Sequence, residues 1–332
     1  MLKVSILGFG NIAHALIADG NISKVNFFVI SESFKKNDEN VSIINVLDEK
    51  IVSTGSITPH VSTAETLLNS DVILFCLPSN LREFYLNKFK DLFNPSAILG
   101  AIPGISGFNE EVENILGENR KIFSLQRVPY ISRIIERGKS VQSYKKEEIF
   151  VACNFDRKFC SEVLNTLFNM KISFLENFDH VNLSNSNPLL HTSRLYSYLL
   201  DKKPPFEISK KEKFYEDWND FASKTLIEMD KEFMLLVNKL GLNGVRNILE
   251  HYDVNSVNEL TQKIKSIQSF KAIDFPNIKQ KDLTYIVDFN SRYFSEDFDH
   301  GLTYLSNKAK LNHIEIPKIN EVLDFYNNVI KT

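Results

Sequence analysis

The sequence predicts an α/β N-terminal domain built on a doubly wound parallel sheet, followed by an all-α C-terminal domain. Three observations support this prediction. Short apolar runs alternate with helical patterns up to residue 176, a glycine-rich turn follows the first run, and the pattern from Asn187 onward is almost entirely helical. Alternating strands and helices are typical of a parallel sheet with helices on both faces. We therefore expect one domain over residues 1–176 and a second over residues 177–332.

The predicted strands of the first domain are short and apolar. They cover residues 4–7, 25–30, 72–77, 97–101, 122–125 and 149–153. A continuous apolar run such as 72–77 is typical of a strand that is buried on both faces. In the second domain, apolar residues recur at three- and four-residue steps over 214–240, and Gly241 follows where a helix often ends. We expect one long helix there.

Composition excludes several classes of protein. The formal net charge is −3 at pH 7, so we expect no nucleic-acid partner. No run of about 18 apolar residues occurs, so we expect no membrane partner. The three cysteines lack the spacing of a metal site and are too few for a disulfide framework. The first apolar run is too short for a secretion signal, and we expect a cytoplasmic protein without a bound metal.

A glycine-rich turn follows the first predicted strand and opens the first predicted helix. It reads Gly8-Phe9-Gly10-Asn11-Ile12-Ala13 and matches the dinucleotide-binding fingerprint G-x-G-x-x-G/A. Gly8 permits a tight turn, Gly10 lets a pyrophosphate approach the backbone, and Ala13 lets the helix pack on the sheet. The helix N-terminus offers free N–H groups to the phosphates. In this context the motif predicts a Rossmann domain that binds a nicotinamide dinucleotide.

The end of the second predicted strand indicates which dinucleotide is bound. An acidic residue at this place commonly holds the ribose hydroxyls of NAD, but Ser31 occupies it here. Ser31 and Ser33 offer donors to a 2′-phosphate, and Lys35 offers a neutralising charge. We therefore expect NADP (NADPH) in preference to NAD. If the strand ends one residue later, Glu32 becomes the ribose ligand instead and favours NAD.

A second loop of interest lies at the end of the predicted strand 72–77. Leu77, Pro78 and Ser79 come at the carboxyl end of that strand, where loops on the nicotinamide side of a Rossmann crevice arise. We expect these residues to contact the cofactor. An ordinary strand-to-helix turn with a capping residue explains them equally well.

The candidate general base is His191, one of seven histidines. It follows a cluster of asparagines and serines and then Pro188, a residue that can open a helix at its first position. His191 is therefore expected in the first turn of a helix, where the N-terminus favours a neutral ring. A general base must be neutral to accept a proton, so the position suits this role.

A histidine base gains from a carboxylate that fixes its tautomer. The segment 291–302 offers Glu296, Asp297 and Asp299, and composition does not choose among them. Arg292, in the same segment, has the fork geometry to clamp a substrate carboxylate or a pyrophosphate. A surface ion pair with one of these acids explains Arg292 equally well.

Over nearly its whole length the chain resembles the opine dehydrogenase family, which includes the octopine and nopaline dehydrogenases. The likeness rests on several blocks in the expected order. They cover residues 8–13, 128–134 with 138–141, 185–191, 214–216 with 229–232, and 292–297 with 301–302. The chain departs from the family at Thr192, where a proline often follows the histidine.

The resemblance implies roles for individual residues. His191 matches the family's catalytic histidine, and Asp297 matches its aspartate partner. Asn187, Tyr130 and Arg292 lie in family blocks, and the resemblance implies that they bind substrate. The fold implied is a Rossmann domain followed by a helical catalytic domain.

The resemblance also implies an activity. Enzymes of this family condense an α-keto acid with the amino group of an amino acid and reduce the imine with NAD(P)H, which gives a secondary amine dicarboxylate. This is dehydrogenase chemistry at a CH–NH group. The alternatives are a Rossmann-type dehydrogenase acting on keto or hydroxy acids and a catalytically inactive nucleotide-binding regulator. We expect small-molecule substrates and, as the assembly, a homodimer.

Overall fold

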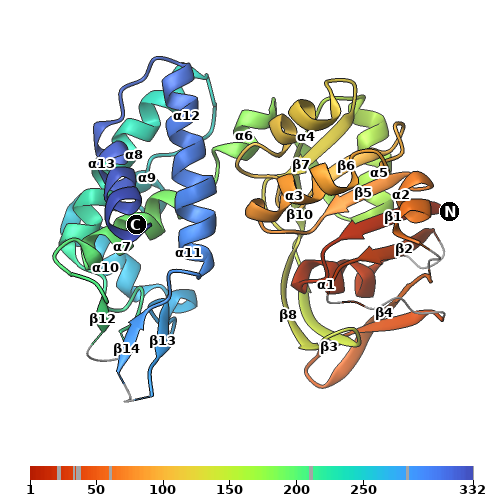
Figure 1. Ribbon diagram of the computed structural model, residues 1–332, viewed down its shortest axis with the longest axis horizontal. Helices are drawn as coiled ribbons and strands as arrows, with labels where there is room; N and C mark the ends of the chain where they lie inside the picture. Colours follow the sequence, from red (N-terminus) through yellow and green to blue (C-terminus); the bar gives the residue numbers. More distant parts are fainter. Residues whose placement is uncertain are drawn as a thin grey trace. The chain divides into compact units, whose positions relative to one another are not determined.

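The computed structural model describes residues 1–20, 24–32, 34, 39–59, 62–208, 212–281 and 284–331. The chain divides into two compact units, Met1–Ser184 and Asn185–Thr332 (Figure 1). The sequence predicted the division at residue 176. The observed division comes later because helix α6 (Phe178–Asn182) belongs to the first unit. This helix packs on strands β7 (Lys121–Leu125) and β10 (Glu148–Cys153).

The first unit has the predicted α/β architecture. Its other strands are β1 (Leu2–Leu7), β2 (Val25–Ile30), β3 (Val41–Leu47), β4 (Lys50–Ile57), β5 (Val72–Phe75), β6 (Ile98–Ala101), β8 (Tyr130–Glu136), β9 (Ser140–Lys145) and β11 (Lys171–Phe174). Its other helices are α1 (Asn11–Asp19), α2 (Thr63–Leu68), α3 (Ser79–Phe89), α4 (Phe108–Leu116) and α5 (Arg157–Phe168).

Among the described residues, the strands of the first unit form one sheet in the order β11-β10-β7-β6-β5-β1-β2-β4-β3-β9-β8. Strand β1 pairs in parallel with β2 and with β5, in registers that align Leu7 with Ile30 and with Phe75. The strand order reverses at β1, because β2 lies on one side of it and the later strands β5 and β6 on the other. Ligands of open α/β sheets bind at such a switch point, beyond the carboxyl ends of the strands.

Helices cover both faces of this sheet. One apolar core contains side chains from α1 and α5, among them Leu16 and Leu164. The other contains side chains from α2, α3 and α4, among them Leu86 and Phe108. Every residue of β5 is buried, which explains the continuous apolar run in the sequence. The predicted doubly wound fold is therefore confirmed.

Two hairpins extend the sheet beyond the predicted strands. Strands β3 and β4 pair antiparallel across a turn at Asp48 and Glu49, which both have positive φ. Strands β8 and β9 also pair antiparallel, and β9 joins β3 in parallel. Polar and apolar residues mix in these strands because one side of each is exposed. The sequence therefore lacks the continuous apolar runs that identified the central strands.

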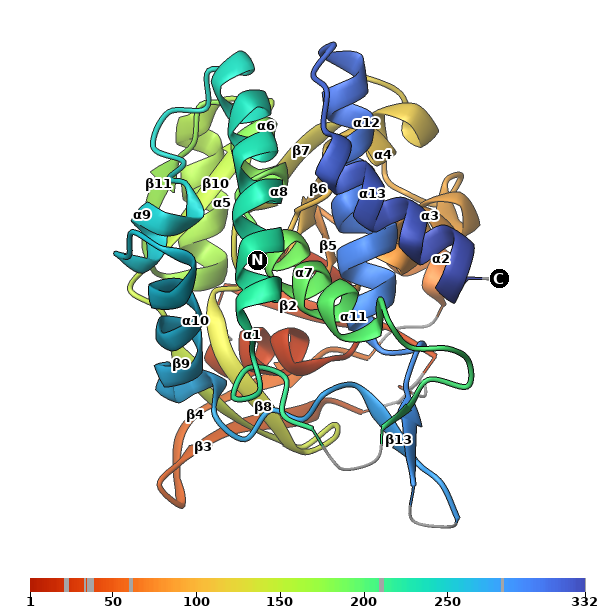
Figure 2. The ribbon, with the colours of Figure 1, turned by 90° about the vertical axis from the view of Figure 1, so that its left-hand side faces the viewer.

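The second unit is mainly helical, as predicted. Its helices are α7 (Asn187–Leu199), α8 (Asp220–Lys239), α9 (Ile248–Tyr252), α10 (Val257–Ser266), α11 (Arg292–Phe294), α12 (Thr303–Leu311) and α13 (Pro317–Phe325). A π-helical segment, η2 (Ser295–Leu302), joins α11 to α12. Figure 2 shows α7 beside α11. Helix α7 contacts η2, and α11 continues directly into it.

Two details of the second unit differ from the prediction. Three short strands, β12 (Glu207–Ile208), β14 (Tyr285–Val287) and β13 (Asn277–Lys279), form a small antiparallel sheet that was not predicted. Strands this short leave no readable periodicity. The predicted helix 214–240 begins only at Asp220, because the side-chain oxygen of Asn219 caps it by accepting the N–H of Ala222 at 2.8 Å.

Within the described ranges, the longest and most apolar helices still fall short of what a membrane span requires. The same residues contain no group of three or more His, Cys, Asp or Glu side chains arranged to hold a metal ion.

Candidate active site

The glycine-rich turn lies at the carboxyl end of β1, as predicted. Gly8 has φ +98°, a conformation that strains any residue with a side chain. A Cβ at Gly8 would also lie 2.6 Å from the carbonyl oxygen of Cys76 and 2.8 Å from Leu77 Cδ2. Gly8 is therefore required both by the turn and by the loop that follows β5.

Gly10 serves a different purpose. A Cβ built on Gly10 would meet no atom of the described residues within 4 Å, so the chain itself does not demand glycine here. Gly10 supplies no side-chain cap to α1, and the first N–H groups of that helix point outward from its N-terminus. An open space before uncapped N–H groups fits a pyrophosphate. Ala13 is fully buried against the sheet, as its small size predicted.

The buried side chain of His14 links the turn to Gly138 through two hydrogen bonds. It is completely buried, and its Nε2 accepts the N–H of Gly138 at 2.8 Å. Nδ1 therefore carries the proton and donates to the carbonyl oxygen of Gly10 at 2.9 Å. Burial lowers the pKa of His14 and keeps the ring neutral. The ring of Phe9 is buried and stacks on it, with ring centroids 4.0 Å apart.

The β8–β9 hairpin makes two further contacts with the turn. Asn11 Oδ1 accepts the N–H of Ile134 at 2.9 Å, so the Asn11 side chain shapes the turn. Arg137 Nη1 approaches the carbonyl oxygen of Phe9 at 3.5 Å, which brings a guanidinium close to the turn. Sequence analysis assigned no role to His14 or Arg137. The four-residue spacing of His14 from Gly10, one helical turn, is a signal from which the contact between them could have been predicted.

A cavity of about 400 Å³ lies at the carboxyl end of β2. Its walls include Ser31, Glu32, Phe34, Thr63, Tyr85 and Lys88. Ser31 directly follows the strand, as predicted, and it borders this cavity. Ser33 and Lys35, the other predicted ligands of a 2′-phosphate, lie outside the described residues.

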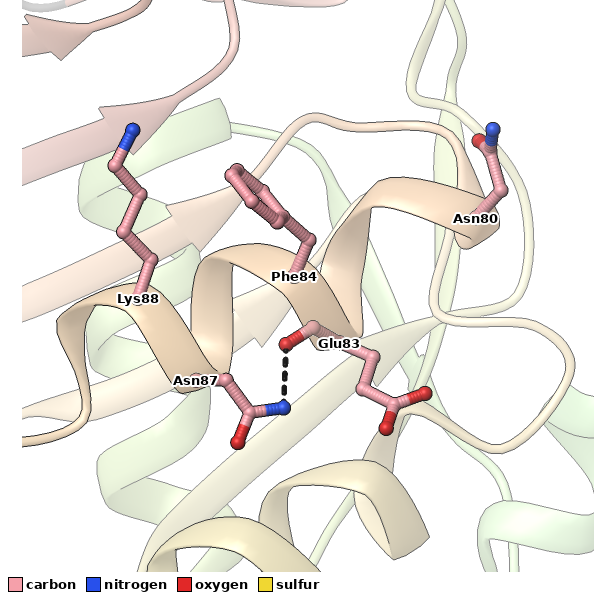
Figure 3. A pocket seen from close by; sticks show the side chains of 5 residues that line it. All are labelled: Asn80, Glu83, Phe84, Asn87 and Lys88. Atoms are coloured by element: carbon pink, nitrogen blue, oxygen red, sulfur yellow. Dashed lines mark hydrogen bonds between the residues drawn. The ribbon is translucent and has the colours of Figure 1, made fainter.

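Lys88 was not predicted, and it places a cation in the wall of this cavity. Its Nζ lies 3.8 Å from Glu32 Oε1, a long contact between side chains that are 43% and 80% exposed. Figure 3 shows Lys88 and Phe84 projecting to the same side of α3. Both side chains line a second hollow of about 760 Å³. The ammonium lies 5.3 Å from the centroid of the Phe84 ring. No sequence pattern points to Lys88, because only the packing of α3 brings it to β2.

The predicted loop after β5 lies against the glycine turn, since Leu77 contacts the position of Gly8. Pro78 occupies the N-cap of α3, and Ser79 is the first residue of that helix and buried. The structure thus brings residues 77–79 and the turn together at one edge of the sheet.

His191 is the fifth residue of α7, one position beyond the predicted first turn. Ser186 and Pro188 begin the helix, as the proline suggested. His191 is 7% exposed. Tyr293 lies edge-on to it with ring centroids 4.8 Å apart, and Phe214 lies edge-on at 5.6 Å. The ring is thus enclosed by aromatic side chains.

Asp297 is the carboxylate that meets His191. Its Oδ2 lies 2.7 Å from His191 Nδ1, and both residues are buried. Asp297 belongs to the π-helical segment η2, and π-helical turns occur frequently at functional sites. Gly301 brings η2 close to α7, because a Cβ at Gly301 would lie 2.5 Å from the ring of Pro188. Asp299, an alternative from the sequence, instead binds Lys331 at 2.7 Å.

Tyr215 forms a hydrogen bond with the other ring nitrogen of His191. Its hydroxyl lies 2.8 Å from Nε2, and its ring stacks on Phe270 at 4.1 Å. Burial raises the pKa of Tyr215 well above its ordinary value, with the neighbouring Tyr293 and Asp297 acting in the same direction. Tyr215 is therefore a neutral hydrogen-bond donor. Sequence analysis cited it only within a family block, because no local pattern relates residue 215 to residue 191.

The remaining predicted substrate ligands fall in different surroundings. Arg292 is exposed at the start of α11. Burial raises the pKa of Tyr293, and the positive charge of Arg292 acts in the opposite direction. Asn187 is exposed at the start of α7. Tyr130 is 1% exposed, and its hydroxyl donates to Asp19 Oδ2 at 2.9 Å. The structure makes Tyr130 a core residue of the first unit, which corrects the prediction that it binds substrate.

Comparisons with known proteins show what this chain is similar to. Residues 174–330 match the family model of the NAD/NADP octopine/nopaline dehydrogenase alpha-helical domain. The chain is 22% identical to tauropine dehydrogenase of Arabella iricolor over 362 residues, which cover 98% of this chain and 90% of that protein.

Two solved structures share the fold. Octopine dehydrogenase with NADH and L-arginine superposes with a TM-score of 0.82 and 20% identity, over 100% of this chain and 90% of that one. Yersinopine dehydrogenase with bound NADP+ gives a TM-score of 0.70 and 13% identity, over 100% and 91%. The glycine turn and the buried histidine–aspartate pair thus occur in a chain whose helical unit matches the octopine/nopaline dehydrogenase domain and which is similar to opine dehydrogenases over nearly its whole length.

Proposed function

We propose that this protein is an opine dehydrogenase, which condenses an α-keto acid with the amino group of an amino acid and reduces the product with NAD(P)H. The observation that carries the proposal is the buried pair of His191 and Asp297, in a chain that also has the dinucleotide turn at 8–13. The relatives' names support the same reaction class, since they act as tauropine and octopine dehydrogenases.

The reaction first needs a proton acceptor. An amino acid carries an ammonium group near neutral pH, and this group has no lone pair for attack on a carbonyl carbon. Imidazole is neutral above about pH 6.5 and can accept that proton. His191 takes this role, and the Asp297 carboxylate stabilises the ring once it is charged. The same proton returns when the carbinolamine loses water to form the imine.

The cofactor contributes the reduction: a bound nicotinamide supplies the hydride that reduces the imine carbon. The residues that would hold it are Gly8, Gly10 and the N-terminus of α1, with Arg137 close by. The carboxyl end of β2 would hold the adenosine ribose. Residues 77–79 adjoin the turn and would line the nicotinamide side. Octopine dehydrogenase binds NADH and yersinopine dehydrogenase binds NADP+, so relatives use both dinucleotides.

For this chain we propose a preference for NADPH over NADH. Ser31 follows β2 in place of an acidic residue, and Lys88 supplies a cation to the wall of the same cavity. The contact between Lys88 and Glu32 is long and exposed, so a 2′-phosphate can replace the Glu32 carboxylate as the partner of this ammonium. Arg292, exposed at the start of α11, has the geometry to bind a substrate carboxylate.

The test is a spectrophotometric screen of NADPH and NADH oxidation. Pyruvate, glyoxylate and 2-oxoglutarate are each combined with a panel of amino acids, and every pair is compared with the keto acid alone. We expect turnover only when an amino acid is present, and loss of turnover in His191→Ala with cofactor binding unchanged. Oxidation without any amine would instead identify a keto-acid reductase. No oxidation with any pair, although the dinucleotide binds, would identify a nucleotide-binding regulator.

A further inference from the structure

The hydrogen bonds of His191 assign its protons. The Asp297 carboxylate can only accept, so Nδ1 of His191 carries a hydrogen and donates to Oδ2 at 2.7 Å. In the neutral ring Nε2 is then an acceptor, and the Tyr215 hydroxyl donates to it at 2.8 Å. Both ring nitrogens are engaged. Nε2, the nitrogen that must accept a proton from the substrate, therefore already accepts a hydrogen bond from the Tyr215 hydroxyl.

Tyr215 is held rigidly in this position. It is 4% exposed, and its ring is nearly parallel to that of Phe270, at 16° with centroids 4.1 Å apart, and to that of Trp218, at 10° with centroids 6.3 Å apart. The indole N–H of Trp218 in turn donates to Ser223 Oγ at 2.9 Å. Such packing holds the hydroxyl against Nε2, because a change of χ1 that moved the hydroxyl would also lift the ring from Phe270.

We propose that the Tyr215 hydroxyl relays the proton between the substrate amine and His191. This inference rests on the proposed function, and it makes Tyr215 a third catalytic residue. The ammonium gives a proton to the phenol oxygen while the phenol gives its own proton to Nε2. The amine gains a free lone pair, the ring becomes imidazolium beside Asp297, and Tyr215 ends as it began, a neutral phenol.

The reverse transfer serves the second step. The imidazolium returns its Nε2 proton to the phenol oxygen while the phenol O–H protonates the hydroxyl of the carbinolamine, which leaves as water. The two transfers occur together at each step, because burial disfavours a free phenolate at Tyr215. No net proton is gained or lost by the pair of residues over the two steps.

The variant Tyr215→Phe tests the relay while keeping the stacked ring. The matched control is Tyr196→Phe, which lies on the same helix as His191 and loses a 2.6 Å phenol hydrogen bond to Glu321, away from the ring. We expect Tyr215→Phe to lower kcat by about 100-fold, the scale of general acid–base catalysis. We expect the wild-type proton inventory in H2O–D2O mixtures to require two protons in flight, and that of Tyr215→Phe to require one.

A second readout does not depend on turnover. The 15N chemical shift of His191 Nε2 is measured at one fixed pH in the wild type and in Tyr215→Phe. An acceptor nitrogen that loses its donor shifts downfield, so the Nε2 resonance of the variant should move downfield. A kcat for Tyr215→Phe within twofold of the wild type, or an unchanged Nε2 shift, would overturn the relay. A wild type without amine-dependent turnover would overturn the proposed function instead, and the Nε2 shift would still report on the Tyr215 contact.

Discussion

Nδ1 of His191 and Oδ2 of Asp297 lie 2.7 Å apart although 106 positions separate the two residues in the chain. Two features of the fold produce this contact. Pro188 helps to begin α7 just before the histidine, and Gly301 lets the π-helical segment approach that proline. The pair is buried, so its charge-assisted hydrogen bond is little weakened by water. These two local features thus bring the carboxylate to the imidazole.

Asp297→Asn should abolish most of the activity while keeping the shape of the site. An amide can turn its NH2 toward Nδ1, which moves the ring proton to Nε2, where it opposes the Tyr215 hydroxyl. The variant also lacks the charge that stabilises imidazolium. We expect kcat to fall by about 100-fold or more, with the NADPH Kd unchanged. The measurement is steady-state kinetics together with cofactor titration. More than half of the wild-type kcat in this variant would contradict the role given to Asp297.

Gly10→Ala should separate cofactor binding from folding. Gly10 has φ −95°, and its added Cβ would meet no atom of the described chain within 4 Å, so the melting temperature should stay within a few degrees. The methyl group would instead occupy the space proposed for the pyrophosphate. We expect the Kd for NADPH to rise at least about tenfold, measured by the fluorescence of the bound nucleotide.

Gly8→Ala provides the contrast to Gly10→Ala. Its positive φ costs of order 1–3 kcal/mol for a residue with a side chain, and its Cβ would overlap the carbonyl oxygen of Cys76. We expect this variant to melt at a clearly lower temperature as well as to lose binding. Undiminished binding in Gly10→Ala would refute the assignment of the turn.

The part of the site that depends on local sequence was predictable. The turn at 8–13 is read from residues within one strand and one helix, and its strand and helix appear where expected. His191 was marked by its neighbours, and only the resemblance to a family singled out Asp297 among three nearby acids. A carboxylate and a histidine so distant in the chain leave no periodic signal. Their meeting depends on packing at Gly301, which a single sequence does not specify.

The residues that sequence analysis missed all depend on tertiary contacts. Lys88 reaches the end of β2 from α3, and Tyr215 reaches His191 from the segment before α8. His14 is a core residue because the β8–β9 hairpin, which alternates polar and apolar residues, folds over the turn. In each case the local sequence predicts the helix or strand itself but not the contacts that it makes with other elements.

Lys88→Gln should weaken NADPH binding more than NADH binding. A charge-assisted hydrogen bond to phosphate contributes roughly 1.5–3 kcal/mol, which corresponds to about a tenfold or greater rise in Kd. The NADH Kd should change by less than twofold, since NADH has no 2′-phosphate. The control is Lys90→Gln, an exposed lysine at the end of the same helix. Equal effects on both dinucleotides, or no effect on either, would contradict the proposed role of Lys88 and the preference for NADPH.

Asp230→Asn should change how stability depends on pH. Asp230 is 6% exposed on α8, and its Oδ2 accepts the N–H of Ile248 at 2.8 Å. Burial raises the pKa of Asp230 from 3.8 to about 6, despite this hydrogen bond. Between these two values the folded state binds more protons than the unfolded state, so the contribution of Asp230 to stability is full below about pH 4. It is lost as the pH rises through 6.

The loss amounts to about 3 kcal/mol in the wild type, by the conversion of 1.36 kcal/mol per pKa unit. An amide at position 230 does not ionise, and its oxygen can still accept the N–H of Ile248. The free energy of unfolding, measured by urea denaturation at pH 4.5 and 7.5, should therefore decline less with pH in Asp230→Asn than in the wild type. Asp201→Asn, an exposed site in the same unit, should behave as the wild type does. Identical pH dependence in Asp230→Asn and the wild type would show that burial does not hold a proton on Asp230, since its ionisation would then be the same in the folded and unfolded chains.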